Sequence, residues 1–216
     1  MSGLIIVGAG PLIGRSVARR FAREGLPVAV VARRLATADE TVAAVREDGG
    51  RAAAWAADAT DEKGLRAALD AAVEAHGVPD AVVYNAGLIR ADRLGELSAE
   101  EFLATLAVNV VGVLTTAAHV GPGMAAAGRG TFLVTGGMPQ PLASHVSLSL
   151  GKAGVRAAAD MLAQELGPSG VHVATVTVAD EVKHGTPYDP DDIADQYWEL
   201  HGQAPEDWER EVLFAR

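Results

Sequence analysis

The chain has 216 residues, 49% of them hydrophobic, and its 18 Lys and Arg against 28 Asp and Glu give a formal net charge of −10. This length suits one α/β domain, and so acidic a chain has no broad basic face for a phosphate backbone, which argues against nucleic acid as a partner. The chain has no cysteine and no histidine spacing typical of metal ligands, so we expect no disulfide, no thiol catalysis and no metal site.

Short apolar runs alternate along the chain with longer helical stretches. The expected strands are Leu4–Val7, Val28–Ala32, Ala52–Ala56, Ala81–Tyr84, Thr131–Thr135 and Val171–Val178. The expected helices lie near 12–24, 38–48, 62–76, 99–127 and 147–166. This alternation predicts an α/β fold of the Rossmann type, with a doubly wound parallel sheet in a three-layer α/β/α single domain.

Two helix starts carry a capping signal. Thr37 with Glu40, and Ser98 with Glu101, match the capping box, in which two side chains satisfy free amides of the first turn.

The stretch from Phe102 to Gly128 has no Asp, Glu, Lys or Arg and is long enough to span a bilayer. Because it contains Asn, Thr, His and Pro, we interpret it as a core or subunit-interface helix and not as a membrane span.

The character of the chain changes after the sixth expected strand. Residues 179–216 hold two of the three Trp, two of the three Tyr and many acids, and prolines punctuate two short helices expected near 190–201 and 205–213. This segment has too little apolar mass to fold alone. We therefore predict one domain over residues 1–216, in which residues 179–216 form a lid over a substrate or a subunit contact.

A glycine-rich turn follows the first strand. Gly8, Gly10 and Gly14, with Leu12 and Ile13 between them, lead straight into the first helix. Glycines at a strand-to-helix turn allow close approach of a pyrophosphate, and the helix N-terminus offers amides and a favourable dipole. The sequence therefore predicts a dinucleotide site at this turn.

The end of the second strand indicates which dinucleotide binds. NAD(H) sites usually place an Asp or Glu there to bind the ribose. Here Arg33 and Arg34 follow the strand instead, and their forked donors suit a 2′-phosphate. Solvated surface arginines are the alternative interpretation, but the missing acid favours NADP(H) over NAD(H).

With these motifs in order, residues 3 to 185 resemble the short-chain dehydrogenase/reductases. The matching positions are the three glycines of the turn, Asp58 with the following Ala59, Asn85-Ala86-Gly87, Asn109 and Lys152. The resemblance implies that Asp58 holds the adenine ring and that Asn85, Ala86 and Gly87 lie beside the cofactor. It also implies that Asn109 orders a water and the catalytic lysine, and that Lys152 binds the nicotinamide ribose.

Three positions depart from the family pattern. Leu12 stands at the usual middle glycine, and Val178-Ala179 replaces the Pro-Gly after the sixth strand, where Ala179 would still border the cofactor. The catalytic Tyr of the family lies four residues before the Lys, and here that residue is Leu148. Because Leu has no titratable group, a ketone reductase of the usual mechanism, in which the Tyr is a general acid, is disfavoured.

Two other residues are candidates for binding the substrate oxygen and for donating the proton that the missing Tyr would supply. Thr135 falls where the family has a Ser thirteen residues before its Tyr, and it would hold a substrate oxygen. Enoyl-thioester reductases, divergent relatives that also lack the middle glycine, place their Tyr seven residues before the Lys, and here that position is His145. Histidine can donate a proton near neutral pH. The alternative is that His145 is a polar loop residue.

Three functions remain open on the sequence alone. The first is an NADP(H)-dependent oxidoreductase acting on a small or medium-sized organic carbonyl or activated alkene, with His145 or water as an atypical proton donor. The second is a non-redox cyclase, isomerase or lyase on the same scaffold. The third is a catalytically silent homologue that binds NADP(H). The fold alone does not choose among them.

The resemblance also implies assembly. The helices expected at 99–127 and 147–166 are rich in small residues, and their counterparts in the family pair across subunits, so a homodimer or homotetramer is expected. The N-terminal strand lacks the basic flank and cleavage site of a signal peptide. Together with the absence of cysteine, this favours a cytoplasmic protein. The family resemblance implies a small-molecule substrate.

Overall fold

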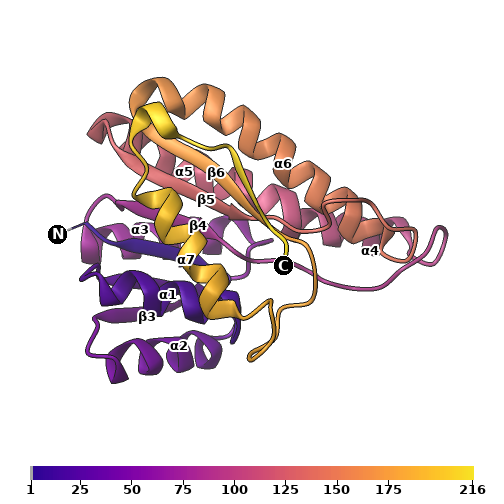
Figure 1. Cartoon of the computed structure of the whole chain (residues 1–216), viewed down its shortest axis with the longest axis horizontal. Coiled ribbons are helices and arrows are strands. Elements are labelled where there is room, and N and C mark those ends of the chain that lie inside the picture. The colour runs from indigo at the N-terminus through magenta and orange to yellow at the C-terminus, as the bar shows by residue number, and fades with distance from the viewer. Residues whose placement is uncertain (1) are drawn as a thin grey trace.

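The computed structural model describes residues 2–216, and these form one twisted sheet covered by helices on both faces (Figure 1). The strands are β1 (Leu4–Val7), β2 (Val28–Ala32), β3 (Ala52–Ala56), β4 (Ala81–Tyr84), β5 (Gly130–Thr135), β6 (Val171–Val178) and β7 (Glu211–Phe214). The helices are α1 (Ile13–Arg23), α2 (Leu35–Glu47), α3 (Glu62–His76), α4 (Ala99–Leu106), α5 (Gly112–Ala127), α6 (Val146–Leu166) and α7 (Pro190–His201). The predicted Rossmann-type α/β/α architecture is confirmed.

The sheet is parallel throughout, in the order β3-β2-β1-β4-β5-β6-β7. The chain runs outward from β1 to β3, returns to β4 beside β1 and continues to the other edge. In open sheets of this kind, ligands bind at the carboxyl ends of the strands where the order reverses. That point lies here between β1 and β4.

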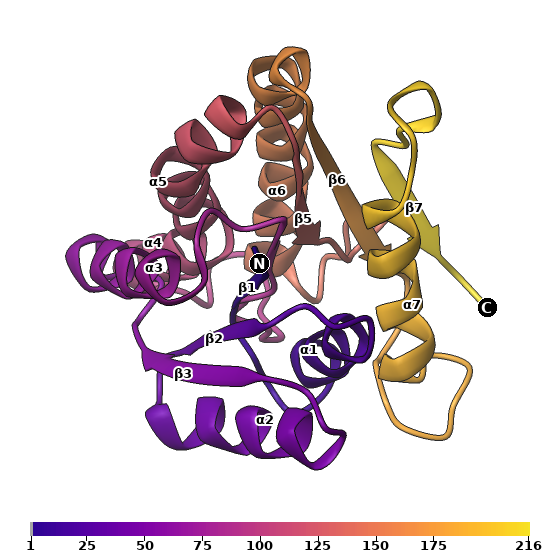
Figure 2. The same cartoon turned by 90° about the vertical axis from the view of Figure 1, so that its left-hand side faces the viewer.

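Every residue of β1, β2, β4 and β6 is buried, as expected for strands covered on both faces. One hydrophobic cluster joins the sheet to α1, α2 and α7, and a second joins it to α3, α5 and α6. Figure 2 shows these two layers on opposite sides of the sheet. The sheet therefore divides the core into two halves, and helices pack against the strands on both faces.

The capping predictions have opposite outcomes. Ser98 and Glu101 form both hydrogen bonds of a capping box at the start of α4, as predicted. The Thr37 prediction is wrong, because α2 already begins at Leu35 and its N-cap is Arg34. Glu40 does not reach back to its own helix start, since its carboxylate accepts a hydrogen bond from Arg15 on α1 over 2.9 Å.

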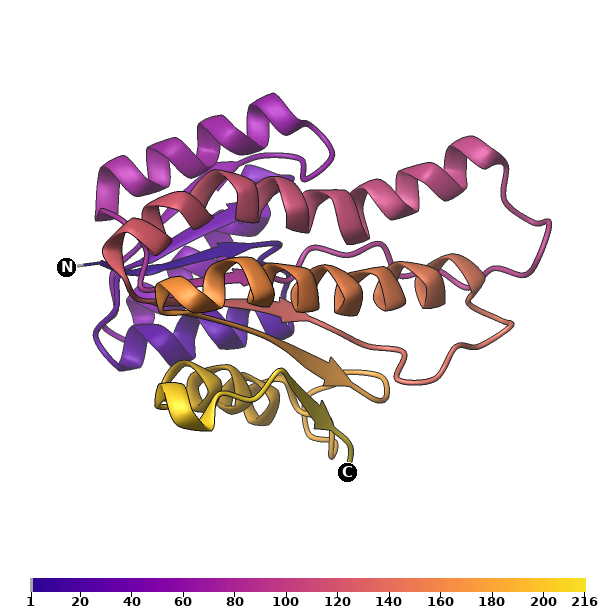
Figure 3. The same cartoon turned by 90° about the horizontal axis from the view of Figure 1, so that it is seen from above.

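The long helix expected at 99–127 forms with one irregularity. Its α4 and α5 portions are joined by a π-helical turn at Ala107–Val111, which contains the buried Asn109. By length and composition, Ala99–Ala127 is the one helix among residues 2–216 that is long and apolar enough to cross a membrane, and 44% of its most apolar window is buried. It lies beside α6, and both extend past the strand ends (Figure 3). We interpret it as a core helix.

The C-terminal segment differs from its prediction in one element. The helix expected at 190–201 is α7, but the helix expected at 205–213 is wrong. Pro205–Asp207 form a single 3₁₀ turn, and β7 then joins the open edge of the sheet beside β6. Helix α7 packs on α1, and Ile193, Ala194, Tyr197, Leu200 and Phe214 contribute buried side chains to the domain core. A lid or subunit role for residues 179–216 stays a prediction.

Candidate functional site

The glycine turn lies against the segment after β4, and two of its glycines are sterically required. Gly8 has φ +92°, and a Cβ there would lie 2.2 Å from the backbone nitrogen of Ala86. A Cβ on Gly14 would lie 2.7 Å from the Cα of Ala9. Gly10 differs, because a Cβ there meets no described atom within 4 Å. The turn is thus tight on its inner side and open at Gly10.

The start of α1 fits an anionic group. Among residues 2–216 no side chain caps its N-terminus, and its first turn holds no acid. Leu12, the N-cap residue, is 36% exposed, and Ile13 behind it is half-buried. An uncapped helix start beside an open glycine turn suits a pyrophosphate, because both the amides and the dipole favour negative charge. The irregular middle position, Leu12, leaves this arrangement in place.

The residues expected to hold the adenosine end follow β2 and β3. Arg33 and Arg34 are exposed directly after β2, and Arg33 lies close enough to Asp58 to act on its charge. The Asp58 carboxylate accepts hydrogen bonds from the backbone and hydroxyl of Thr60, and these bonds lower its pKa. Ala59 approaches α5, since a Cβ on Gly112 would lie 3.1 Å from its carbonyl oxygen.

Asn109 ties the π-helical turn to the segment after β4. Its amide oxygen accepts from the Leu88 nitrogen over 3.1 Å, and its amide nitrogen donates to the Leu88 oxygen over 3.3 Å. Gly87 lies between the two predicted site residues on helices: a Cβ there would be 3.2 Å from Asn109 Oδ1 and 3.9 Å from Lys152 Nζ. Asn109, Gly87 and Lys152 therefore meet at the carboxyl edge of the sheet.

Lys152 is buried on α6, and its Nζ donates to the backbone oxygen of Thr135 over 2.7 Å. Burial lowers the pKa of this lysine to about 8, and the positive charge of Arg156 one turn further along α6 adds to the effect. Arg156 itself donates to the backbone oxygens of Gly137 and Met138. Met138 has φ +49°, so the chain after β5 is held in an unusual conformation beside the lysine.

Leu148 lies one helical turn before Lys152 and is 5% exposed. Residues four apart on a helix share a face, so an apolar side chain stands where the family resemblance implies a phenol. The hydroxyl of Thr135, in turn, faces the α1 and α7 side of the sheet, where it donates to Asn85 and meets Tyr197. Whether Thr135 holds a substrate oxygen stays a prediction.

His145 is the N-cap residue of α6, half-buried, with its Nδ1 3.0 Å from the Ser144 hydroxyl. Seven residues separate it from Lys152, which is about 10 Å along a helix axis. The first turn of α6 is held by the buried Asp92, whose carboxylate accepts from the backbone and the hydroxyl of Ser147. The hydrogen bonds of Asp92 thus fix the helix start next to His145, and His145 lies about two helical turns from Lys152.

Two residues at this edge, Asp92 and Arg156, were missed by sequence reasoning, and Tyr197 was singled out from the sequence only as a residue that could line a substrate pocket or pack the tail. Asp92 and Arg156 brace the loops around the lysine, and Tyr197 contacts Thr135 from α7. The charge of Arg156, four residues after Lys152, is the one signal the sequence offered. Ala179, expected beside the cofactor, uses its amide for the sheet, where it donates to the Phe214 oxygen over 3.1 Å.

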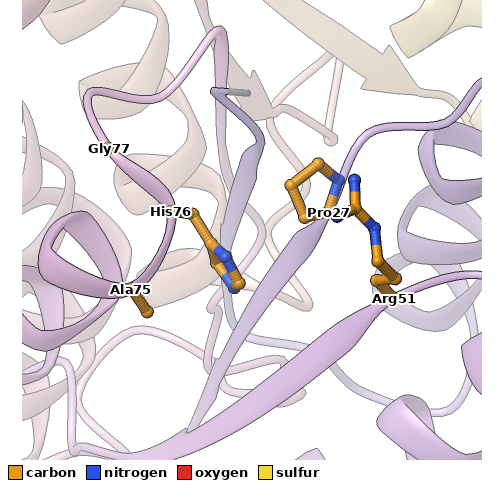
Figure 4. A pocket seen from close by; sticks show the side chains of 5 residues that line it. All are labelled: Pro27, Arg51, Ala75, His76 and Gly77. Carbon is orange, nitrogen blue, oxygen red and sulfur yellow. The ribbon is translucent and has the colours of Figure 1, made fainter.

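A hollow of about 410 Å³ opens at the opposite, amino edge of the sheet (Figure 4). It is lined by Pro27, Arg51, Ala75, His76 and Gly77, none of which belongs to the predicted site. Burial lowers the pKa of His76, and its Nε2 has no hydrogen-bond partner among the described residues. In addition, no group of three or more acidic or histidine side chains placed to hold a metal occurs in residues 2–216.

The sheet order, the glycine turn at the switch point and the buried lysine beside the end of β5 define an α/β scaffold of the Rossmann type. Comparison with known families identifies it: the family described as short chain dehydrogenase matches residues 3–180. The chain belongs to the short-chain dehydrogenase family. Similar curated proteins are named as oxidoreductases or dehydrogenases.

Among curated proteins, the chain is similar to the probable oxidoreductase EphD of Mycobacterium tuberculosis, with 34% identity over 174 residues. That match covers 79% of this chain but 29% of the relative, so this chain spans less than a third of EphD. It is also 31% identical over 175 residues to the D-threitol dehydrogenase of Mycolicibacterium smegmatis, covering 80% of this chain and 67% of that protein.

Solved structures give the same picture. A short-chain dehydrogenase from Rhodopseudomonas palustris has a TM-score of 0.90 and 27% identity, covering 100% of this chain and 98% of that one. A metagenomic short-chain oxidoreductase in complex with NADP has a TM-score of 0.88 and 28% identity, covering 99% and 97%. The fold of this chain is therefore matched over nearly its whole length by both structures.

Proposed function

We propose that this chain is an NADP(H)-dependent oxidoreductase that acts on a small or medium-sized organic carbonyl or an activated alkene. The observation that carries the proposal is the convergence of the Gly8 turn and the buried Lys152 at the carboxyl edge of the sheet, on either side of Asn85 and Gly87. The NADP complex of a similar solved structure supports the cofactor class.

In this proposal each residue has a binding or positioning role. Arg33 and Arg34 meet the 2′-phosphate, the uncapped start of α1 and the open side of Gly10 receive the pyrophosphate, and Asp58 holds the adenine ring. Lys152 donates to the ribose. The bound nicotinamide supplies the hydride.

The proton for the substrate oxygen or carbon comes from His145 or from water, because Leu148 has none to give. A His145→Ala variant separates these sources. Loss of turnover by 100-fold or more, with unchanged NADP⁺ affinity, assigns the proton to His145, since general acid catalysis contributes about 10²–10⁴-fold. Unchanged turnover assigns it to water.

The test of the function itself has two stages. Calorimetry first measures binding of NADP⁺ and NADPH to the purified chain. NADPH oxidation is then followed across a panel of ketones, quinones and enoyl thioesters. Turnover of at least one class supports the proposal, and absence of any heat of binding at millimolar ligand refutes it.

A second candidate, a catalytically silent homologue that binds NADP(H), is favoured by one observation, the buried Leu148 beside Lys152. Tight binding of NADP(H) without turnover of any substrate in the panel would select this function. A non-redox enzyme on the same scaffold would show turnover that persists when the nicotinamide nucleotide is removed.

We also propose a homodimer or homotetramer in the cytoplasm. Apolar side chains are exposed along the neighbouring helices α4, α5 and α6, namely Leu103, Leu114, Leu150 and Met161, together with Val111 of the π-helical turn. Burying such a surface against a second copy is favourable. Light scattering at micromolar concentration tests the assembly, and a stable monomer there contradicts it.

A further inference from the structure

We propose that Tyr197, on the C-terminal helix α7, is a positioning residue of the dinucleotide site, because its hydroxyl ends a chain of three hydrogen bonds that holds Asn85 and, through Asn85, the glycine turn. This inference rests on the proposed function in one respect only: the ligand of the turn is taken to be NADP(H). The positioning itself can be measured without any ligand.

The three hydrogen bonds run from α7 across β5 to the turn after β1. The hydroxyl of Tyr197 lies 2.7 Å from Thr135 Oγ1, and Thr135 Oγ1 donates to Asn85 Oδ1 over 2.8 Å. Asn85 Nδ2 donates to the Gly8 backbone oxygen over 2.7 Å. The residues joined lie far apart in the sequence, and Tyr197 is fully buried.

The donor and the acceptor of each of these three hydrogen bonds can be assigned. A backbone carbonyl can only accept, so the Asn85 amide must turn its nitrogen to Gly8 and its oxygen to Thr135. That amide oxygen takes the single proton of Thr135. Thr135 Oγ1 can then only accept from Tyr197, whose burial raises its pKa and keeps it protonated. Tyr197 is therefore the donor that completes the chain.

The three hydrogen bonds act on the glycine turn, which has little conformational freedom. Gly8 is pressed against Ala86, and a Cβ on Gly14 would lie 3.1 Å from Asn85 Nδ2. The side chain of Asn85 thus bonds to the first glycine of the turn and leaves little room for a Cβ on the last. Removing the Tyr197 hydroxyl leaves a buried lone pair on Thr135 without a donor, which frees the threonine to rotate and Asn85 to follow.

A consequence follows for the C-terminal segment. Helix α7 is held on α1 by the Arg20–Asp195 ion pair, by the guanidinium of Arg20 over the Trp198 ring and by the edge contact of Phe21 with Trp198. If α7 steadies the turn, then a ligand on the turn must steady α7, because coupling between two sites is reciprocal. NADP⁺ should therefore slow hydrogen exchange in residues 193–200.

The experiment compares Tyr197→Phe with Tyr188→Phe. The Tyr188 hydroxyl contacts only the main chain of Arg216 among its described hydrogen-bond partners, so its loss is a matched control within the same segment. Three quantities are measured: the NMR shift of the Asn85 side-chain amide without ligand, the Kd for NADP⁺ by calorimetry, and hydrogen exchange in α7 with and without NADP⁺.

For Tyr197→Phe we expect a shifted and broadened Asn85 amide signal and a Kd raised about fivefold or more, the lower end of ordinary coupling between sites. Protection of α7 by NADP⁺ should weaken. Tyr188→Phe should match the wild type in all three. A purely structural tyrosine would lower the melting temperature and leave both the Asn85 signal and the Kd unchanged, which overturns the proposal.

Two safeguards keep the test decisive. If Tyr197→Phe does not fold, Thr135→Val breaks the same chain at its middle and should shift the Asn85 amide; an unshifted signal overturns the inference. If the wild type binds no NADP⁺, the proposed function fails, but the ligand-free Asn85 signal still decides whether Tyr197 positions the turn.

Discussion

Lys152 donates a hydrogen bond from its ammonium group to the backbone oxygen of Thr135 over 2.7 Å, inside the protein and without a carboxylate to balance its charge among its described hydrogen bonds. A buried, unbalanced cation is destabilising. A residue that opposes folding in this way, placed where a nucleotide would bind, indicates a functional site.

Replacing Lys152 by Met should stabilise the folded chain at pH 7 and weaken NADP⁺ binding. The gain is on the order of 2 kcal/mol in the free energy of unfolding, because each unit of pKa depression corresponds to about 1.4 kcal/mol and the lost hydrogen bond offsets part of it. Urea unfolding measures the first effect and calorimetry the second. Lys63→Met, at an exposed position on α3, is the control and should change neither.

The same substitution has a pH signature. With a pKa of about 8 in the folded state, lowered from 10.5, Lys152 binds fewer protons in the folded than in the unfolded chain between those two values. The stability contribution of this group therefore rises with pH across that window, and its penalty is complete below pH 8. The advantage of Lys152→Met should shrink from pH 7 to pH 10. An advantage that is constant with pH would contradict a charged, buried lysine.

The glycine turn offers a matched pair of substitutions. Gly8→Ala forces a Cβ to 2.2 Å from the Ala86 nitrogen at φ +92°, so we expect loss of the folded state or of several kcal/mol of stability. Gly10→Ala meets no described atom within 4 Å and should leave the melting temperature unchanged. If the pyrophosphate lies against Gly10, the Kd for NADP⁺ rises at least tenfold in that variant. An unchanged Kd places the phosphates elsewhere.

How far the sequence determined this structure depends on the range of the interactions. All six predicted strands, from Leu4–Val7 to Val171–Val178, were placed within one residue. Strands β1, β2, β4 and β6 are buried along their whole length, and burial on both faces favours the apolar and β-branched residues that make such strands easy to recognise. Strand β7 was missed for two reasons. It is mostly exposed and lacks the apolar run of the buried strands, and the proline turn before it resembles a helix start.

The site was predictable only where motifs are local. The turn around Gly8, the Asn85–Gly87 segment and Lys152 lie at one edge as the motif order implied. The hydroxyl of Thr135 meets Tyr197 across a separation of 62 residues, and no pattern in the sequence encodes that contact. The π-helical turn at Asn109 likewise arises from packing and not from local propensity.

Cofactor choice should depend on the two arginines after β2. Arg33→Ser and Arg34→Ser each remove charge-assisted hydrogen bonds to a 2′-phosphate, which should raise the Kd for NADP⁺ about tenfold or more per site. The Kd for NAD⁺, which lacks that phosphate, should change little. Arg210→Ser, at another exposed arginine, controls for net charge. Equal weakening of both nucleotides would show that the arginines do not read the 2′-phosphate.

Restoring a phenol beside Lys152 tests whether the site keeps a redox geometry. Leu148→Tyr places a hydroxyl one turn before the lysine on the same helix face, at a position now 5% exposed. We expect ketone reduction to increase about 100-fold, the lower end of general acid catalysis, while the larger ring costs about 1–3 kcal/mol of stability through overpacking. Leu148→Phe has nearly the same volume without the hydroxyl and should show the stability loss alone. Equal turnover in the two variants would mean that the substrate oxygen does not lie near residue 148, and the proton route would then have to start at another residue or at water.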